Sequence, residues 1–395
     1  KCILVDTRAQ LKSHLYVIIY LVMHTAFQCS LKLNCRCLLQ EVYDLIALGA
    51  GAGGLVSSKQ SARRGAKSAM ISEHLAGGDC LNVGCVPSKA LLRAARAVRE
   101  VKNAAEFGMT LPDDIQIDFA TIMRRLREKR RAIAPADGHG GTVGAGAHVY
   151  QGRGVFTGPD TIRVGETELK FKKAVIATGG RPSVPGVPGL KEAPYTTNET
   201  LFNLQTLPPR MVVLGAGVIA LEMAQAFSTF GSHVTVVQRS TTLFASKLGD
   251  PEAAEILKKE IGKSGVKFVS GSTKQLTTLR EQNDKDLTDF PLMKVMIETD
   301  DGDVELECEC LLVATGRVSN VENLGLEEAG VEYNLGSGVT VNDHSQSVSN
   351  PNVYSVGDCT AGVPRLTHMS GEMAKLVVQN SLFNDDWKLS SLVVP

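Results

Sequence analysis

The sequence predicts an α/β protein with two doubly wound, Rossmann-like nucleotide-binding domains. Its 395 residues allow two or three domains at about 150 residues each. Two segments, beginning at Tyr43 and Met211, share the same order of buried strand, glycine-rich turn, helix and second apolar strand. This order is typical of parallel sheets that bind a dinucleotide at the turn. We therefore expect one nucleotide-binding domain around each segment.

The composition excludes several other classes of protein. Lysine and arginine together number 42, as do aspartate and glutamate, so the chain lacks the basic excess of a nucleic-acid-binding protein. Hydrophobic residues make up 43% of the chain, which is enough for sizeable cores and too many for wholesale disorder. The nine cysteines are too few for a secreted scaffold held by disulfides. We expect no nucleic-acid partner.

The first 40 residues differ in character from the rest. The chain begins with Lys1 rather than Met, and we expect residues 1–40 to be a leader, either a targeting segment or a non-native one. Its apolar run 15–23 is shorter than the roughly 20 residues that a membrane-spanning helix needs. Cys35 and Cys37 lie there too, without the spacing of a metal motif. We expect no metal site and no membrane partner.

The first glycine-rich turn directly follows a predicted strand. Gly49, Gly51 and Gly54 have the spacing that lets a backbone approach a pyrophosphate, and the following helix directs its positive N-terminus toward the phosphates. A carboxylate that binds ribose hydroxyls is expected about 18 residues after the third glycine. That position is Ser72, so we assign the contact to Glu73, one residue further on.

The second turn repeats this arrangement with Gly215, Gly217 and Ala220. The strand that follows ends at Gln238, and the next residue is Arg239. An uncharged residue followed by arginine suits a 2′-phosphate, because a carboxylate would repel the phosphate whereas a guanidinium can bind it with two hydrogen bonds. The second site is therefore predicted to prefer NADPH to NADH.

Two cysteines indicate the chemistry of the first domain. Cys80 and Cys85 are separated by four residues and precede a helix predicted over 90–98. A pair this close in sequence forms a strained, reducible disulfide, and a helix N-terminus with a neighbouring cation favours the thiolate. We predict a redox-active disulfide; the alternative is two unpaired core cysteines.

Two other polar patterns are interpreted as structural. Cys308 and Cys310 alternate with glutamates in the manner of one half-buried strand, so both are predicted to be core residues. A basic stretch lies within the helix predicted over 119–133. We interpret it as a solvated helix face, with a nucleic-acid patch as the alternative.

From Tyr43 to its end, the chain resembles the FAD-dependent pyridine nucleotide–disulfide oxidoreductases. The segment Gly77–Lys89, GGDCLNVGCVPSK, carries the resemblance together with the two glycine-rich turns. The family includes glutathione reductase, dihydrolipoyl dehydrogenase and mercuric reductase, and the cysteine segment is most similar to mercuric reductase-like members. The resemblance implies that the first domain binds FAD and the second binds NAD(P)H.

The resemblance also implies roles for individual residues. Cys85 is implied to be the thiol that faces the flavin, and Cys80 the thiol that exchanges with substrate. Lys89 is implied to lie near the flavin as a buried ammonium that Glu222 keeps charged. Further FAD contacts are implied for a set of residues at the ends of three strands: Thr178, Gly179, Gly316, Arg317, Gly357 and Asp358.

The family's domain organisation can be transferred to the chain. The FAD-binding domain is expected over 41–190 and 318–385, with the NAD(P)H-binding domain inserted over 191–317. Residues 386–395 are expected to begin an interface domain, which in family members supplies a histidine followed by proline. No histidine in this sequence is followed by proline. We therefore expect a truncated chain whose full-length form is a homodimer.

The expected reaction passes a hydride from NADPH to FAD, electrons on to Cys80 and Cys85, and then reducing equivalents to a small-molecule acceptor, a disulfide or Hg(II). One alternative is a disulfide reductase of the dihydrolipoyl dehydrogenase or glutathione reductase type. Another is a truncated, catalytically incomplete flavin-binding protein. Dithiol chemistry favours a reducing compartment, the cytoplasm or the matrix of a plastid or mitochondrion.

Overall fold

The computed structural model describes most of the chain after the predicted leader, over residues 42–110, 112, 115–240, 243, 250–282 and 289–394. Residues Tyr43–Pro395 form one compact unit. The leader, with Cys29, Cys35 and Cys37, lies outside the described residues. Within the described part of the chain, no helix is both long and apolar enough to cross a membrane.

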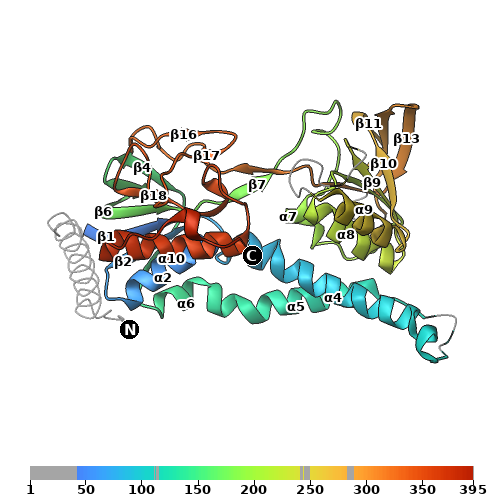
Figure 1. The fold of residues 1–395 in the computed structure, drawn as a ribbon, viewed down its shortest axis with the longest axis horizontal. Helices are drawn as coiled ribbons and strands as arrows, with labels where there is room; N and C mark the ends of the chain where they lie inside the picture. Colours follow the sequence, from blue (N-terminus) through green and yellow to red (C-terminus); the bar gives the residue numbers. More distant parts are fainter. Residues whose placement is uncertain are drawn as a thin grey trace, which may run out of the picture. The chain divides into compact units, whose positions relative to one another are not determined.

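The first sheet has seven strands, drawn from both ends of this unit (Figure 1). Its order is β3-β2-β1-β6-β5-β4, with β18 paired to β6. The pairs β1–β2, β2–β3 and β6–β18 are parallel, whereas β4 and β5 extend the sheet in antiparallel fashion. The strands are β1 (Val42–Leu48), β2 (Ser68–Ser72), β3 (His148–Gln151), β4 (Gly154–Gly158), β5 (Thr161–Val164), β6 (Thr167–Ile176) and β18 (Val353–Ser355).

Both faces of the central strand β1 are covered, which explains its nearly continuous apolar sequence. On one face, Leu45 and Ala47 pack against α10 (Thr367–Phe383). The helix α2 (Ala52–Arg63), which follows β1, lies beside α10. Ile46 points to the opposite face, as alternate residues of a strand do, and packs in a second core.

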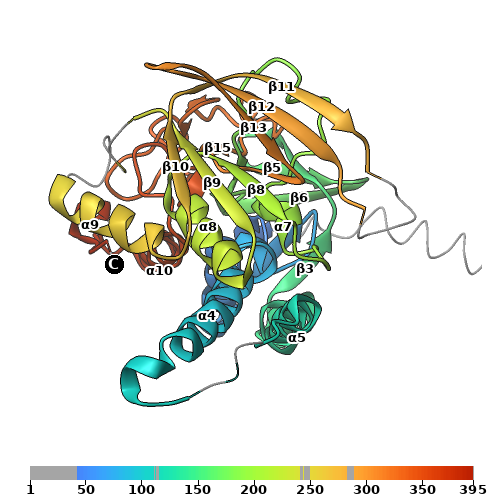
Figure 2. The same cartoon turned by 90° about the vertical axis from the view of Figure 1, so that its right-hand side faces the viewer.

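The second sheet has the order β10-β9-β8-β14 and is parallel throughout. On one face, Met211 and Val213 pack with α8 (Val218–Phe230). On the other face, Val212 and Leu214 pack against a three-stranded antiparallel sheet, β11-β12-β13 (Figure 2). The strands are β8 (Arg210–Leu214), β9 (His233–Gln238), β10 (Lys267–Ser270), β11 (Ser272–Arg280), β12 (Leu292–Thr299), β13 (Gly302–Cys308) and β14 (Cys310–Val313).

Two segments connect the sheets and run side by side. β7 (Gly180–Pro182) leaves the first sheet, β15 (Arg317–Ser319) leaves the second, and the two pair in antiparallel fashion. The short and peripheral elements are α6 (His139–Val143), α7 (Asn198–Leu201), α9 (Pro251–Gly262), β16 (Tyr333–Asn334), β17 (Gly338–Val339), η1 (Ala104–Phe107), η2 (Gly357–Cys359) and η3 (Leu389–Ser391).

A pair of long helices follows the cysteine segment. The short α3 (Gly78–Asn82) leads into α4 (Cys85–Lys102), and α5 (Phe119–Asp137) packs beside α4 (Figure 1). Leu91 and Ala95 bury one face of α4 in the core that also contains α8. Both helices predicted in this region are therefore confirmed.

The single strand predicted through Cys308 and Cys310 is wrong. β13 ends at Cys308 and β14 begins at Cys310, and the two strands belong to different sheets. The strand is interrupted at Glu309, whose carboxylate accepts a 2.6 Å hydrogen bond from Arg210. Both cysteines are buried as predicted, at 0% and 4% exposure, and burial raises the pKa of each thiol to about 12.

Candidate functional site

A cavity of about 920 Å³ opens beside the carboxyl ends of the first sheet's strands. Its walls come from the glycine turn after β1, from α3, and from the segments around β7, β15 and η2. Clefts of this size at such a sheet edge are typical of cofactor sites.

The first glycine turn has the geometry that a bound pyrophosphate requires. Gly49 has φ +121°, and a Cβ there would lie 2.2 Å from the Ala177 carbonyl oxygen, so only glycine fits. A Cβ on Gly54 would lie 1.8 Å from the Gly49 oxygen, which means that α2 packs tightly on the turn. Gly51 differs, because among the described residues a Cβ there meets only the Gly78 Cα, at 3.7 Å. The space in front of Gly51 belongs to the cavity.

Ser72 and Glu73, the two positions considered for the ribose contact, differ in their surroundings. The Ser72 side chain is buried and donates a 2.7 Å hydrogen bond to the His74 carbonyl. Glu73 lines the cavity and forms an ion pair with Arg153 at 3.2 Å. The carboxylate available to a ribose at this place is therefore that of Glu73.

The second glycine turn repeats the first. Gly215 has φ +104°, and a Cβ there would lie 2.4 Å from the Ala314 carbonyl oxygen. A Cβ on Gly217, the N-cap residue of α8, would meet no described atom within 4 Å. Ala220 is fully buried where α8 packs on the sheet. Each turn thus leaves open space at its second glycine, where a ligand can approach the backbone.

Of the two residues predicted to contact a phosphate at the end of β9, only Arg239 is exposed. Gln238 ends β9 and is buried, at 3% exposure, whereas Arg239 is exposed. No carboxylate occupies either position, so the guanidinium of Arg239 is the charged group offered at the end of this strand.

The two cysteines lie at the junction of α3 and α4. The two are free rather than joined in a disulfide, and a side-chain hydrogen bond links them. The hydrogen bond from Cys80 lowers the pKa of Cys85 to about 5; burial opposes this shift, while the Thr367 hydroxyl, 3.5 Å from the Cys85 Sγ, and the charge of Lys89 reinforce it. The same hydrogen bond and burial raise the pKa of Cys80. These shifts favour the proton on Cys80 and the thiolate on Cys85.

Lys89 of α4 and Glu222 of α8 meet as expected, with 2.9 Å between the Lys89 Nζ and the Glu222 Oε1. The expected burial of the ammonium is wrong, because the Lys89 side chain is 65% exposed. Water solvates this ammonium, so it does not depend on the carboxylate to stay charged. The pair joins the helix that begins at Cys85 to the helix that begins at the second glycine turn.

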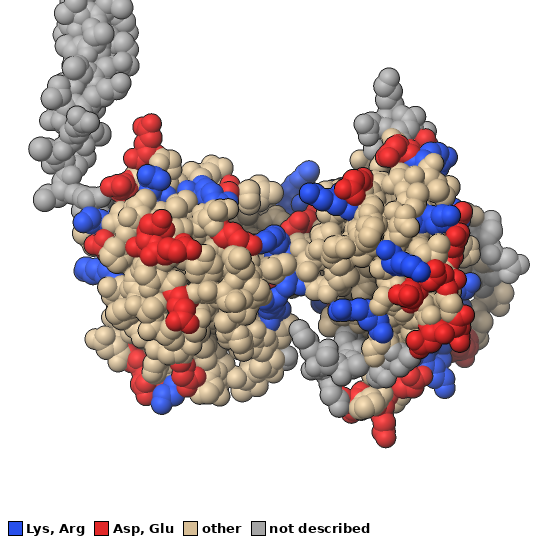
Figure 3. Space-filling view, turned by 90° about the horizontal axis from the view of Figure 1, so that it is seen from above, with Lys and Arg blue, Asp and Glu red and all other residues tan. Residues whose placement is uncertain are grey.

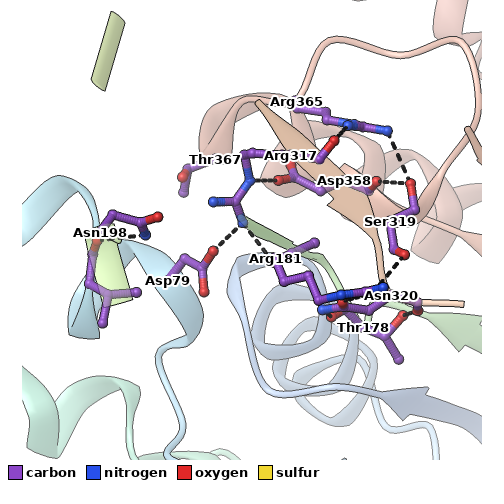
Figure 4. Close-up of polar contacts among 12 residues, drawn as sticks. Asp79, Thr178, Arg181, Asn198, Arg317, Ser319, Asn320, Asp358, Arg365 and Thr367 are labelled. Atoms are coloured by element: carbon purple, nitrogen blue, oxygen red, sulfur yellow. Dashed lines mark hydrogen bonds and ion pairs between the residues drawn. The ribbon is translucent and has the colours of Figure 1, made fainter. Parts of the chain in front are cut away.

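Arg317 holds three segments of the cavity wall together (Figure 4). Its Nε donates to the Asp358 carboxylate at 2.8 Å, and its Nη2 donates to the Asp79 carboxylate and, at 2.7 Å, to the Gly180 carbonyl. Burial lowers the pKa of Arg317, but the charges of Asp79 and Asp358 outweigh burial, so the pKa is raised. The Asp358 carboxylate that lines the cavity is thus fixed in place by an arginine.

The two connecting segments are tied together close to Arg317. The Thr178 hydroxyl donates to the Asn320 carbonyl at 2.6 Å, and the Asn320 amide donates back to the Thr178 carbonyl at 3.1 Å (Figure 4). Arg181 donates to the Asn320 side-chain oxygen at 2.9 Å and to the Glu322 carboxylate at 2.6 Å. These contacts fix the wall of the cavity where the chain crosses between sheets.

The structure brings part of the predicted set together in the cavity and places the rest around it. The cavity is lined by Gly49, Gly51, Glu73, Cys80, Thr178, Gly179, Arg317 and Asp358. The residues outside its described lining are Gly54, Cys85, Lys89, Gly215, Gly217, Ala220, Glu222, Gln238, Arg239, Gly316 and Gly357.

Several lining residues were not predicted from the sequence. Asp79 lies inside the cysteine segment. A carboxylate is unusual beside a phosphate site, and this could have drawn attention to it in the sequence. Thr367 reaches Cys85 across 282 residues of chain, and Asn320 meets Arg181 only because β7 pairs with β15. Such long-range partners leave no local pattern.

Comparison with known proteins relates this geometry to a family. The sequence profile of the pyridine nucleotide-disulphide oxidoreductases matches residues 43–374. A mercuric reductase of Lysinibacillus sphaericus is 31% identical over 356 residues, which cover 90% of this chain and 63% of that protein. A dihydrolipoyl dehydrogenase of Chlamydia muridarum is 32% identical over 348 residues, covering 87% and 70%. A glutathione reductase of Nostoc sp. is 32% identical over 329 residues, covering 80% and 68%. The chain thus spans less than two thirds of the length of the mercuric reductase.

A solved structure has the same fold. The HOCl-induced flavoprotein disulfide reductase RclA from Escherichia coli superposes with a TM-score of 0.73 at 23% identity, over 88% of this chain and 72% of that chain. The predicted fold class, with two Rossmann-like nucleotide-binding domains, is confirmed.

Proposed function

The chain belongs to the pyridine nucleotide-disulphide oxidoreductase family, and we propose that it uses NADPH and FAD to reduce a disulfide between Cys80 and Cys85. Members of this family are FAD-dependent and use NAD(P)H. The balanced reaction converts NADPH, one proton and the disulfide into NADP⁺ and two thiols. The observation that carries the proposal is the cysteine pair itself: the two side chains are hydrogen-bonded, the pKa of Cys85 is lowered, and Cys80 lines the cofactor cavity.

The residues of the large cavity fit FAD. Gly51 leaves room for the pyrophosphate at the N-terminus of α2, Glu73 offers a carboxylate to the ribose, and Asp358 offers one to the ribityl hydroxyls. When bound, FAD supplies the two-electron relay between a nicotinamide and the disulfide. The chain contributes the positions of the groups around it.

The two thiols divide the later chemistry. Cys80 is proposed as the thiol for exchange with an acceptor, the role that the family resemblance implies for it, and a hydrogen bond joins it to Cys85. As the Cys80 sulfur attacks a disulfide or binds Hg(II), its proton is released and can pass to the Cys85 sulfur. We propose one of these acceptors, since the relatives include both a mercuric reductase and a glutathione reductase.

The nucleotide at the second turn is proposed to be NADPH. Arg239 is exposed at the end of β9 and can pair with a 2′-phosphate. The alternative is a dihydrolipoyl dehydrogenase, which would reduce NAD⁺ and gains support from the Chlamydia relative. Another alternative is a flavin-binding protein that lacks the acceptor half of the reaction.

We propose the domain organisation from the family and from the strands that each sheet contains. The FAD-binding domain would comprise 41–190 and 318–385, and the NADPH-binding domain 191–317, which matches the way the two sheets draw their strands. A longer form would be a homodimer in a reducing compartment.

A reductive titration tests the proposal. The chain is loaded with FAD, oxidised, and titrated anaerobically with NADPH or NADH while flavin absorbance is followed. The wild type should consume two equivalents, one for FAD and one for the disulfide, and should react faster with NADPH. Cys80→Ser has no disulfide and should consume one equivalent. Equal consumption by the two proteins would refute the role of the disulfide, and a preference for NADH would favour the dehydrogenase.

A further inference from the structure

A second cavity, of about 570 Å³, lies between α4 and α5 and near the segment that joins them. The two helices lie side by side in both views (Figures 1 and 2). Its described lining shares no residue with the cofactor cavity. The proposed function does not use it, and its volume falls within the range of small-molecule sites.

The lining of this second cavity is mostly apolar. Ala94 and Ala97 on α4 are small and leave a hollow on the helix surface, since a larger side chain at either place would project into it. Val101 and Ile115 are 38% and 46% exposed, which is high for large apolar side chains that line a concavity. Covering them would stabilise a complex by about 25 cal/mol per Å² of apolar surface. The remaining apolar wall consists of Val98, Ile117 and Ile122.

The rim of the cavity is cationic. Arg93, Lys102 and Arg125 line it together with one acid, Asp118. The Asp118 carboxylate caps α5, accepting hydrogen bonds from the Thr121 amide at 2.9 Å and the Thr121 hydroxyl at 2.6 Å. Its charge therefore interacts first with the positive end of its own helix, and the three cations dominate the rim.

Two of these cations bond to neutral groups. Lys102 donates to the Thr229 carbonyl at 3.1 Å, and Arg125 donates to the Ala90 carbonyl at 3.5 Å. Arg93 lies 3.8 Å from the Glu100 carboxylate, and its side chain is 58% exposed. Neither carbonyl neutralises the charge that it binds, so an incoming anion would find positive charge at the rim.

The two helices as a whole reinforce this charge. α4 contains five lysines and arginines and one glutamate, and α5 contains six lysines and arginines and two acids. The chain as a whole has no net charge, and acidic and basic side chains are interspersed on the face seen in Figure 3. The α4–α5 pair is thus an exception that attracts anions.

We propose that the groove between α4 and α5 binds a free fatty carboxylate, with the acyl chain over Ala94 and Ala97 and the carboxylate at the cationic rim. The helix rises 1.5 Å per residue, so the stretch from Arg93 to Lys102 is about 14 Å long and accommodates an extended acyl chain of medium length. An apolar trench with cationic residues in its lining matches a ligand that combines an acyl chain with a carboxylate. The site goes beyond the proposed redox function and does not depend on it.

Calorimetric titration of the whole chain tests this site. Sodium dodecanoate should bind with one site per chain, and dodecyltrimethylammonium, which has the same tail and the opposite charge, should bind at least about tenfold more weakly. Equal affinity for the two amphiphiles would contradict the proposal, since the tail alone would then determine binding.

Matched variants locate the site. Ala97→Phe should fill the hollow and weaken dodecanoate binding at least about tenfold, whereas Ala132→Phe, the same change at an exposed position of α5, should change it less than about twofold. Arg125→Glu should likewise weaken dodecanoate binding at least about tenfold, whereas Arg131→Glu, at an exposed position of α5, should change it less than about twofold. Circular dichroism verifies that each variant is folded, and a variant that does not fold is replaced by Ala94→Phe or Arg93→Glu.

Other occupants would give different results. If Ala97→Phe leaves dodecanoate binding unchanged, the amphiphile binds elsewhere and the proposal is wrong. The proposal is also wrong if the chain does not bind free dodecanoate and sediments only with vesicles of anionic phospholipid, because the groove between α4 and α5 would then bind membranes. A self-association in sedimentation velocity that Ala97→Phe abolishes, without dodecanoate binding, would identify a second copy of the chain as the occupant.

Discussion

At the scale of single residues, the fold lowers the pKa of Cys85, and this favours a reactive thiolate. Its pKa is lowered to about 5, mainly by the hydrogen bond from Cys80, whereas a free cysteine ionises near 8.5. In the reduced chain, alkylation of Cys85 by iodoacetamide should therefore rise to half its plateau near pH 5 and stay constant through neutral pH. Mass spectrometry of the alkylated peptide measures this profile.

Removing the donor tests the cause of that shift. Cys80→Ala abolishes the hydrogen bond to Cys85, so the alkylation midpoint should move upward toward that of a free cysteine. Cys308→Ala is the control, because Cys308 is buried in another core and should leave the midpoint unchanged. A midpoint that stays near pH 5 in Cys80→Ala would show that Thr367 and Lys89 cause the shift instead.

Arg317 is the residue on which the cavity wall depends for stability. Arg317→Leu would leave the carboxylates of Asp79 and Asp358 without their guanidinium. The Arg317–Asp358 pair is partly buried, at 17% and 18% exposure, so its loss should cost about 2 kcal/mol. Urea unfolding should show this loss. Arg153→Leu is the matched control: it breaks a pair whose side chains are 46% and 41% exposed, which costs about 0.5 kcal/mol. Similar losses in both variants would contradict this assignment.

Site residues could be predicted where their pattern lies within a short segment, and not where it depends on distant partners. Gly49, Gly51 and Cys80 were found because their function depends on spacing within a short segment, which the sequence displays directly. Asp79 and Arg317 are 238 residues apart, so their contact has no pattern in the sequence. The burial of Lys89 was mispredicted because exposure depends on tertiary packing rather than on a motif.

At the scale of elements, the two strand–turn–helix units are expected to bind different ligands. Gly51→Ala and Gly217→Ala place a methyl group in the open space of each turn, and both glycines have φ and ψ values that alanine adopts freely. Each variant should unfold within about 0.5 kcal/mol of the wild type. Gly51→Ala should lose at least about tenfold in FAD affinity and Gly217→Ala a similar factor in NADPH affinity.

Each glycine variant serves as the control for the other. FAD fluorescence quenching measures the first affinity, and calorimetric titration with NADPH measures the second. Loss of the same ligand in both variants would contradict the assignment of one nucleotide to each turn.

Element boundaries were harder to predict than the elements themselves. Apolar and acidic residues alternate without interruption up to Cys310, so the sequence indicated one strand. The chain in fact changes sheets at Glu309, because that carboxylate pairs with Arg210 at the start of β8. A break that depends on a partner 99 residues away is invisible to periodicity.

At the scale of the whole molecule, the repeated motif predicted two sheets with parallel strands at their centres, and both are present, although β4 and β5 extend the first one in antiparallel fashion. The antiparallel sheet β11-β12-β13 was not predicted, although Val295 and Ile297 bury one face of the second parallel sheet. Antiparallel strands carry no glycine motif that distinguishes them from surface loops. Parallel units were predictable because the dinucleotide turn marks them.

The central claim is that electrons from the nucleotide reach Cys80 and Cys85. Its most direct test is differential alkylation of the oxidised, FAD-loaded chain before and after anaerobic addition of NADPH, with each cysteine followed by mass spectrometry. We predict that Cys80 and Cys85 alone change from disulfide to alkylated thiol, while Cys308, Cys310 and Cys359 keep the same labelling. Labelling of Cys80 and Cys85 that is unchanged by NADPH, although the flavin is reduced, would contradict the account.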